Sequence, residues 1–120
     1  MQRLKRRRDF LAAAQGRKAP RLAFLLETRR RDESGETRFG FTVTKRMAVK
    51  AVERNRIRRR LREAVRLLDP AVTLAGYDHV LVGRRSALGL DFRRLADDLH
   101  TALAQTYAGA DRTEGPRGRE

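Results

Sequence analysis

Apolar residues recur with helical spacing in two long segments of the chain. Within residues 50–68 and again within residues 91–107 they are three or four positions apart, which places them on one side of an amphipathic helix. The first stripe consists of Ile57, Leu61, Ala64, Val65 and Leu68, and the second of Phe92, Leu95, Ala96, Leu99, Ala102 and Leu103. Asp91 is suited to cap the start of the second helix. A shorter helix is predicted from Arg7 to Gln15, because Gly16 favours a helix end.

Three shorter apolar segments have the character of β-strands. Residues 22–26 form an apolar run of strand length, residues 39–44 alternate between apolar and small or polar side chains, and residues 79–83 form another short apolar run. The acidic, glycine-containing segment 32–36 separates the first two and fits a hairpin loop. The order of elements is then α-β-β-α-β-α, or α-β-β-β-α-β-α if the second strand region is split in two.

This order predicts a single small α+β domain over residues 1–108, with a flexible polar tail over residues 109–120. With 120 residues and 40% hydrophobic residues, the chain is large enough for one core. It has no cysteine, which excludes disulfides and thiolate metal sites and suits a reducing compartment such as the cytoplasm. No run of about 18 apolar residues occurs, so no membrane span or membrane partner is expected.

Positive charge is concentrated in the first of the two long helices and the turn before it. Residues 45–66 carry a net charge of +8, against +14 for the whole chain. Only Glu53 and Glu63 oppose the ten basic residues of this segment. Such a density repels itself, and a polyanion would relieve that repulsion and release counterions as it bound.

Three interpretations of this basic helix compete: a solvated surface, a membrane-surface or calmodulin-target helix, and a nucleic-acid contact. A solvated face usually interleaves acids with arginines, but residues 54–62 contain no acid. A membrane helix would expose large apolar side chains, whereas this apolar stripe suits the covering of a small sheet. The pattern therefore favours nucleic acid. Asn55 is a mediocre helix residue, and is either a neutral surface position or one that contacts RNA or orients Arg54 and Arg56.

Catalysis by the chain alone has little support in the sequence, and no catalytic or metal-binding residue is predicted. His79 and His100 are the only histidines, and no lysine or acid is marked out as their companion. Asp97 and Asp98 are adjacent, so on a helix they point in different directions and favour a solvated face over a metal site. Phe10 follows a basic cluster, and is suited to packing the first helix onto the sheet, to stacking on an unpaired base, or to both.

One motif runs from the second predicted strand into the basic helix: Phe41-Thr42-Val43-Thr44 leads to Lys45-Arg46, and Ala51-Val52-Glu53-Arg54-Asn55-Arg56 then opens the helix. This motif resembles the signature of the bacterial ribonuclease P protein component. The resemblance extends to the cluster before Phe10, to residues 78–84 and to the last helix, and covers about residues 3–107.

The resemblance implies a sheet of about four mixed strands covered by three helices, with a left-handed crossover around the basic helix. It also implies a non-catalytic subunit. The RNA subunit, which holds the Mg2+, removes the 5′ leader from precursor tRNA, and the protein raises the affinity for substrate and for Mg2+. By this resemblance ribonuclease P RNA and precursor tRNA are the partners, and no obligate protein partner is implied. RNA binding falls to Arg54, Asn55, Arg56, Arg58, Arg59 and Arg62, and leader binding, in a cleft between the first helix and the sheet, to Phe10, Lys45 and Arg46.

The chain departs from the family pattern at two places. Residues 47–50 replace a shorter, glycine-containing turn, and Ala14 stands where the family often has a second aromatic residue. Three rival functions remain: a structural RNA-binding protein of ribosomal or assembly type, a DNA-binding module, and a stand-alone ribonuclease that uses His79 and His100.

Overall fold

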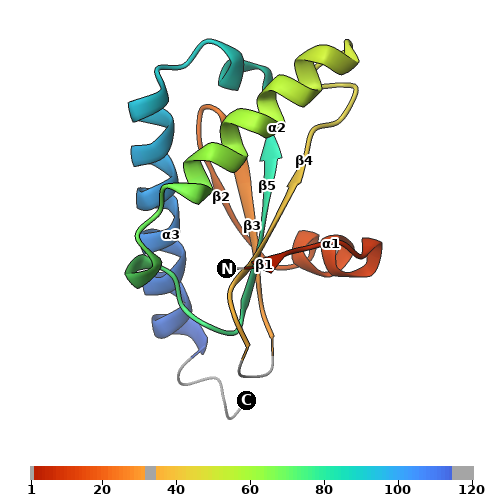
Figure 1. The fold of residues 1–120 in the computed structure, drawn as a ribbon. Helices are drawn as coiled ribbons and strands as arrows, with labels where there is room; N and C mark the ends of the chain where they lie inside the picture. The colour runs from red at the N-terminus through yellow and green to blue at the C-terminus, as the bar shows by residue number, and fades with distance from the viewer. Residues whose placement is uncertain (1, 32–34, 115–120) are drawn as a thin grey trace.

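A five-stranded mixed sheet forms the centre of the molecule (Figure 1), as seen in a computed structural model that describes residues 2–31 and 35–114. The strands are β1 (Gln2–Arg3), β2 (Arg17–Pro20), β3 (Phe24–Arg30), β4 (Arg38–Thr42) and β5 (Tyr77–Gly83). Their order across the sheet is β1-β4-β5-β3-β2. β4 is parallel to both β1 and β5, whereas β3 is antiparallel to both β5 and β2. β5 lies at the centre, where its apolar run is buried on both faces.

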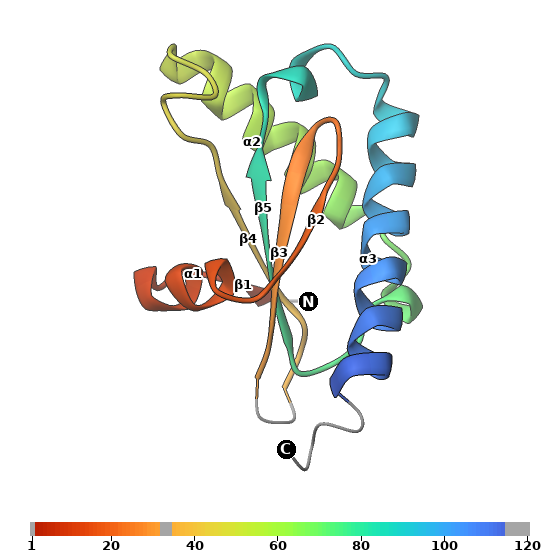
Figure 2. The same cartoon turned by 180° about the vertical axis from the view of Figure 1, so that it is seen from behind.

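Three helices cover the two faces of this sheet in the described residues (Figures 1 and 2). α1 (Arg7–Ala14) lies on one face, and α2 (Ala51–Arg66) and α3 (Phe92–Glu114) lie on the other. Because successive side chains of a strand point to opposite faces of the sheet, the buried residues are divided between the two faces. Leu81 packs with the apolar stripes of α2 and α3, while its neighbour Val80 packs with Leu4 and Ala13 on the α1 side. The short 3-10 helices η1 (Pro70–Val72) and η2 (Arg85–Leu88) connect α2 to β5 and β5 to α3.

The predicted α+β class and the three predicted helices are confirmed, but the predicted hairpin is wrong. β3 and β4 do not pair with each other, because β5 pairs with both and lies between them. Residues 32–34 of the predicted loop lie outside the described residues. β1 adds a fifth strand that was not predicted, because two residues at the start of the chain carry no recognisable alternation. β2 was not predicted at its position either, because Arg17–Pro20 lies before the apolar run 22–26 and has no apolar run of its own. α3 continues past its predicted end at Tyr107 to Glu114, while residues 115–120 of the predicted tail are not described.

The connection from β4 through α2 to β5 is left-handed. With the strands pointing up and α2 toward the viewer, β5 lies to the left of β4 at their carboxyl ends (Figure 1). Parallel β-α-β connections are right-handed in about 98% of cases, because the right-handed twist of the strands favours that hand. The left-handed connection is therefore not favoured by strand twist. The handedness expected from the family resemblance is what the structure has.

Gly83 allows α2 to approach the carboxyl end of β5 closely. A Cβ atom at this position would lie 2.6 Å from Ile57 Cγ2 and 2.9 Å from Val43 Cγ2. These neighbours belong to the buried core between sheet and helix, where little movement is available. The glycine is therefore a packing requirement of the crossover.

Gly83→Ala is expected to lower the free energy of unfolding by about 1–3 kcal/mol, the usual cost of an overpacked core. Urea unfolding followed by circular dichroism measures the change. Gly89→Ala is the matched control, since a Cβ there meets nothing within 4 Å. Equal effects of the two substitutions would contradict the packing argument.

Candidate nucleic-acid interface

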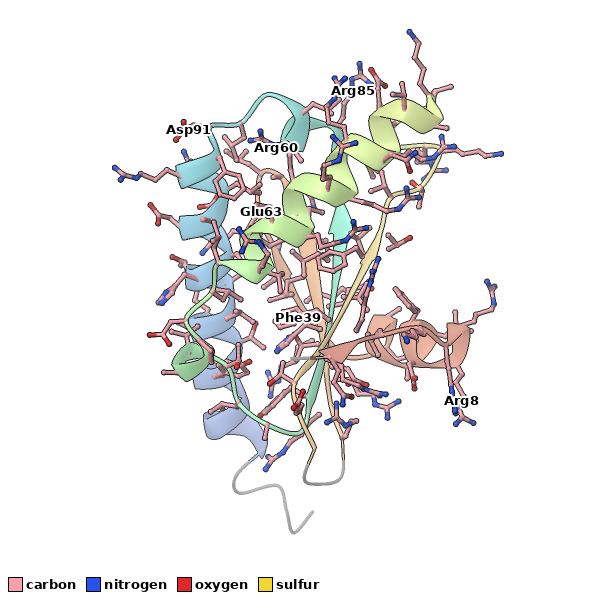
Figure 3. The ribbon with its side chains drawn as sticks, in the orientation of Figure 1. Arg8, Phe39, Arg60, Glu63, Arg85 and Asp91 are labelled. Carbon is pink, nitrogen blue, oxygen red and sulfur yellow. The ribbon has the colours of Figure 1, made fainter. Side chains whose placement is uncertain are left out.

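α2 separates an apolar side that faces the sheet and α3 from a strongly basic side. Its buried residues are Ile57, Leu61, Ala64 and Val65, four members of the predicted stripe. The two acids of the segment are both engaged with arginines, Glu53 with Arg85 at 2.7 Å and Glu63 with Arg66 at 2.6 Å. Glu63 on α2 and Arg85 after β5 are labelled in Figure 3. Arg56 and Arg59 are exposed, and among the described residues neither forms an ion pair with a carboxylate, although Arg56 is near enough to Glu53 to help lower the pKa of that acid. The basic side of α2 is therefore not neutralised by the part of the chain that the structure describes.

Arg54 differs from the other predicted RNA-binding residues. Its Nη1 donates hydrogen bonds to the carbonyl oxygens of Ala48 at 2.9 Å and Val49 at 2.6 Å. The side chain is half-buried and fastens the turn between β4 and α2. This turn contains the residues 47–50 that depart from the family pattern, so Arg54 has a structural role there.

Asn55 orients a different arginine from those expected. Arg58 Nη1 donates a hydrogen bond to Asn55 Oδ1 at 2.7 Å, one helical turn away. The expectation that Asn55 orients Arg54 and Arg56 is wrong, because side chains three positions apart face each other on a helix while adjacent ones diverge. Asn55 thus holds Arg58 in place on the basic side of α2.

Arg62 lies at the centre of a cluster of like charges. Partial desolvation, reinforced by the positive charges of Arg3, Arg58 and Arg59, lowers its pKa below the ordinary arginine value. Its Cζ lies 5.9 Å from the centre of the Phe41 ring. Arg3 comes from the edge strand β1 and was not predicted to contribute, since its position depends on the pairing of β1 with β4. Mutual repulsion of this kind favours an anionic ligand.

The three residues predicted for leader binding lie along or beside β4. Phe10 is half-buried and packs over Gly40, where an added Cβ would lie 2.7 Å from Phe10 Cζ. The packing role of Phe10 is therefore present, and part of the ring stays exposed. Lys45 and Arg46 are exposed in the turn that follows β4. β4 thus links the two parts of the predicted set.

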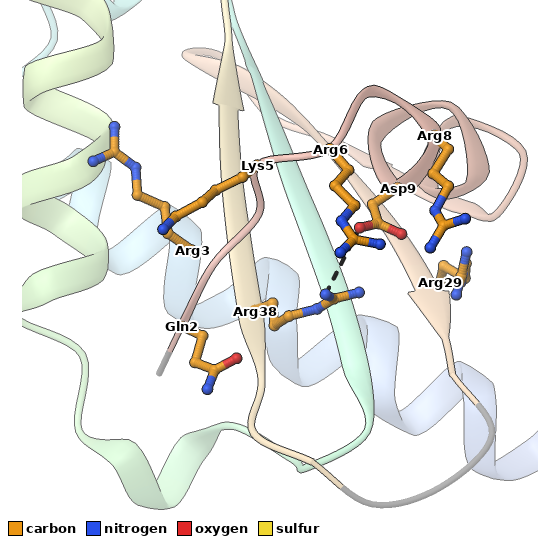
Figure 4. A pocket seen from close by; sticks show the side chains of 8 residues that line it. All are labelled: Gln2, Arg3, Lys5, Arg6, Arg8, Asp9, Arg29 and Arg38. Carbon is orange, nitrogen blue, oxygen red and sulfur yellow. Dashed lines mark ion pairs between the residues drawn. The ribbon is translucent and has the colours of Figure 1, made fainter.

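A cationic cleft of about 800 Å3 lies beside the start of α1 (Figure 4). Its charged lining consists of Arg3, Lys5, Arg6, Arg8, Arg29 and Arg38, with Asp9 as the single acid. Asp9 is buried and lies 3.7 Å from Arg38. The lining does not include Phe10, Lys45 or Arg46, so this cleft extends the basic surface beyond the predicted set. The basic cluster before Phe10 is visible in the sequence, whereas Arg29 and Arg38 join it only through the order of the strands.

Asp78 anchors the cleft from inside the sheet. This fully buried carboxylate accepts two hydrogen bonds from Arg38, both at 2.8 Å, and another from Arg31. Burial alone would raise the pKa of Asp78, but the hydrogen bonds and charges of the two arginines outweigh it and hold the pKa below its usual value. Asp78 thereby fixes the guanidinium of Arg38 between the core and the cleft.

The histidines are not arranged for acid–base catalysis. His79 is fully buried, with Nδ1 2.8 Å from Thr28 Oγ1 and Nε2 2.8 Å from Tyr107 Oη. Burial lowers the pKa of His79 to about 3, so the ring is neutral at physiological pH. His100 is exposed on α3, and Asp98 pairs with Arg94 at 3.3 Å.

The described residues hold neither a metal-ion cluster nor a membrane-spanning helix. In the part of the chain that the structure describes, no three His, Asp or Glu side chains are grouped to bind a metal ion. Over the same residues no helix combines the length and hydrophobicity needed to cross a bilayer.

Comparison with known proteins identifies the family. The family described as Ribonuclease P matches residues 1–107. The ribonuclease P protein component of Gluconacetobacter diazotrophicus is 45% identical over 119 residues, covering 98% of this chain and 95% of the relative. That of Caulobacter vibrioides is 42% identical, covering 92% and 74%. The solved structure of the ribonuclease P protein from Thermotoga maritima superposes with a TM-score of 0.72 at 27% identity, covering 88% of this chain and 97% of that one. The chain therefore belongs to the ribonuclease P protein components, the protein subunits of a ribonucleoprotein endonuclease that processes tRNA.

Proposed function

We propose that the basic side of α2 binds the RNA subunit, through Asn55, Arg56, Arg58, Arg59 and Arg62, with Arg54 holding the turn that presents this side. The observation that carries the proposal is the arrangement of charge on α2. Both acids of the segment are engaged by arginines, and Arg56 and Arg59 face solvent without a carboxylate partner among the described residues. Exposed guanidinium groups of this kind form bidentate contacts with phosphate, and each such contact releases counterions.

We further propose that the single-stranded leader of precursor tRNA lies along the α1 face of the sheet. Phe10 would stack on a base with the exposed part of its ring, and Lys45 and Arg46 would contact phosphates at the carboxyl end of β4. The cationic cleft supplies additional positive charge on the same face. Ala14 stands where the family often has a second aromatic residue, so leader binding in this chain should depend more on charge than on stacking. Its affinity is therefore expected to fall steeply as the salt concentration rises.

The chemistry belongs to the RNA subunit and the Mg2+ that it holds. The protein contributes by placing a net positive surface against RNA, which lowers the local repulsion among phosphates and helps the RNA retain its metal ions at low Mg2+ concentration. This action requires no metal ligand from the protein. We expect the complex to work in the cytoplasm.

Reconstitution tests the proposal directly. The purified protein is added to ribonuclease P RNA and precursor tRNA at low Mg2+, and 5′ cleavage is measured. We expect cleavage to depend on both protein and RNA, with stimulation that disappears as Mg2+ is raised. Absence of stimulation would contradict the proposal, and cleavage by protein alone would support a stand-alone nuclease.

Phe10→Leu is expected to reduce the preference for precursor over mature tRNA by about 1–3 kcal/mol, the value of one base stacked on an aromatic side chain. Leucine keeps an apolar contact with Gly40, so the fold should persist. Leu11→Ala is the control, because Leu11 is 54% exposed on the same helix. Binding of both tRNA forms to the reconstituted enzyme measures the preference, and an unchanged value for Phe10→Leu would assign Phe10 to packing alone.

A further inference from the structure

A groove on the α2 side of β1 combines an aromatic floor with an arginine rim. It encloses about 290 Å3 and is lined by Gln2, Arg3, Phe41, Arg62, Val65 and Arg66, with Phe39 beneath. Phe39 is only 2% exposed, whereas Phe41 is partly exposed and forms the accessible part of the floor. The volume lies just below the roughly 300–1,000 Å3 that is usual for ligand pockets, so the groove suits one small planar group.

The charges of the rim are available to a ligand. Arg66 is held by Glu63 through two hydrogen bonds, but Arg3 and Arg62 have no carboxylate partner among the described residues. Arg62 lies over the Phe41 ring and is surrounded by other arginines, so an anion in the groove would lower the repulsion among them. The groove therefore calls for a ligand with both a flat apolar face and negative charge.

An unpaired nucleotide has this combination, whereas a nucleic-acid duplex and an apolar peptide lack it. A duplex presents its phosphates but keeps its bases stacked inside, and an apolar peptide would leave Arg3 and Arg62 facing one another. Stacking on an aromatic side chain accepts any base, because each base has a π-face. Flanking phosphates would meet the two guanidinium groups, which match phosphate geometry.

We propose that this groove holds one unpaired nucleotide of the RNA subunit, with its base against Phe41 and its phosphates on Arg3 and Arg62. The inference rests on the proposed binding of the RNA subunit to α2, and it adds a defined site at the junction of α2 with β1. The RNA subunit is the source because Arg62 and Arg66 of the groove belong to α2, the helix assigned to that subunit.

Photo-cross-linking in the reconstituted complex tests the site. Ribonuclease P RNA is transcribed with 4-thiouridine, assembled with the full protein, irradiated and digested with trypsin. We expect cross-links in the peptide Phe39–Lys45, which contains Phe41, or in the peptide that ends at Arg3. In a parallel arm only the leader of precursor tRNA carries 4-thiouridine. Cross-links to Phe41 from the leader alone, or none to either peptide from the RNA subunit, would overturn the proposal.

Two substitutions separate stacking from packing. Phe41→Leu keeps an apolar side chain over the core but removes the ring, and should weaken binding of the RNA subunit about tenfold. Phe41→Tyr keeps the ring and should bind within about twofold of the unaltered protein. Equal binding by both variants would contradict the site. If Phe41→Leu fails to fold, the cross-links of the unaltered protein still show whether the RNA subunit occupies the groove. Stimulated cleavage without these cross-links would leave the proposed function intact and remove only the groove, whereas failure of the RNA to bind would remove both.

Discussion

Replacing Asp78 by alanine is expected to lower the free energy of unfolding by about 3–5 kcal/mol, the usual cost of breaking a buried ion pair from one side. The substitution would leave Arg38 without its bidentate partner and Arg31 without its carboxylate, both beside the buried end of β5. Urea unfolding followed by circular dichroism measures the loss. The network joins β4 and β5 to Arg31, which directly follows β3, and it reaches Asp9 of α1 through Arg38, so we expect one cooperative transition at lower urea.

Asp97→Ala is the control, because Asp97 is an exposed acid on α3. Asp78→Asn adds a test by pH. The pKa of Asp78 is lowered in the folded state, so its contribution is complete above the unfolded value of about 3.9 and is lost as pH falls through the folded value. The unaltered protein should therefore lose stability on acidification more steeply than Asp78→Asn. A loss below about 1 kcal/mol for Asp78→Ala would mean that both arginines turn to solvent at little cost.

The double substitution Arg56→Ala with Arg59→Ala is expected to weaken binding of ribonuclease P RNA by about 3 kcal/mol, which is more than a hundredfold. Both side chains are exposed on α2, and neither has a carboxylate partner among the described residues, so the fold should be unaffected. The slope of log affinity against log salt should fall in magnitude by about two, one for each lost phosphate contact. Filter binding over a series of salt concentrations measures both quantities.

Arg93→Ala removes one exposed arginine from α3 and serves as the control for the loss of a positive charge outside α2. Arg54→Ala is a poor choice for this experiment, since loss of its hydrogen bonds to Ala48 and Val49 would loosen the turn before α2. An unchanged salt slope in the double variant would place the phosphate contacts elsewhere on the surface.

The parts of the molecule with long, regular patterns were predictable from the sequence. The apolar stripe and the acid-free arginines of α2 both follow from residue order, as does the amphipathic α3. The hairpin prediction failed because β3 and β4 are neighbours in the sequence, and pairing of neighbouring strands is what a local pattern suggests. In the structure β5 pairs with both of them instead, since its apolar run needs a position that is buried on both faces. Arg29 on β3 and Arg38 on β4 line the same cleft although β5 lies between their strands, so this cleft depends on strand order and not on sequence proximity.

The central position of β5 also bears on how the chain folds as it is synthesised. Among the described residues β5 is the last strand in chain order, and thus the last of them to leave the ribosome, yet both β3 and β4 take their main pairing from it. Until Gly83 has emerged, β3 and β4 lack this partner, and unpaired strand edges favour association between chains. Pairing between distant segments also slows folding. The sheet is thus completed only after residues 77–83 have left the ribosome. Until then α2, whose arginines repel one another, lacks the central strand on which its apolar side packs.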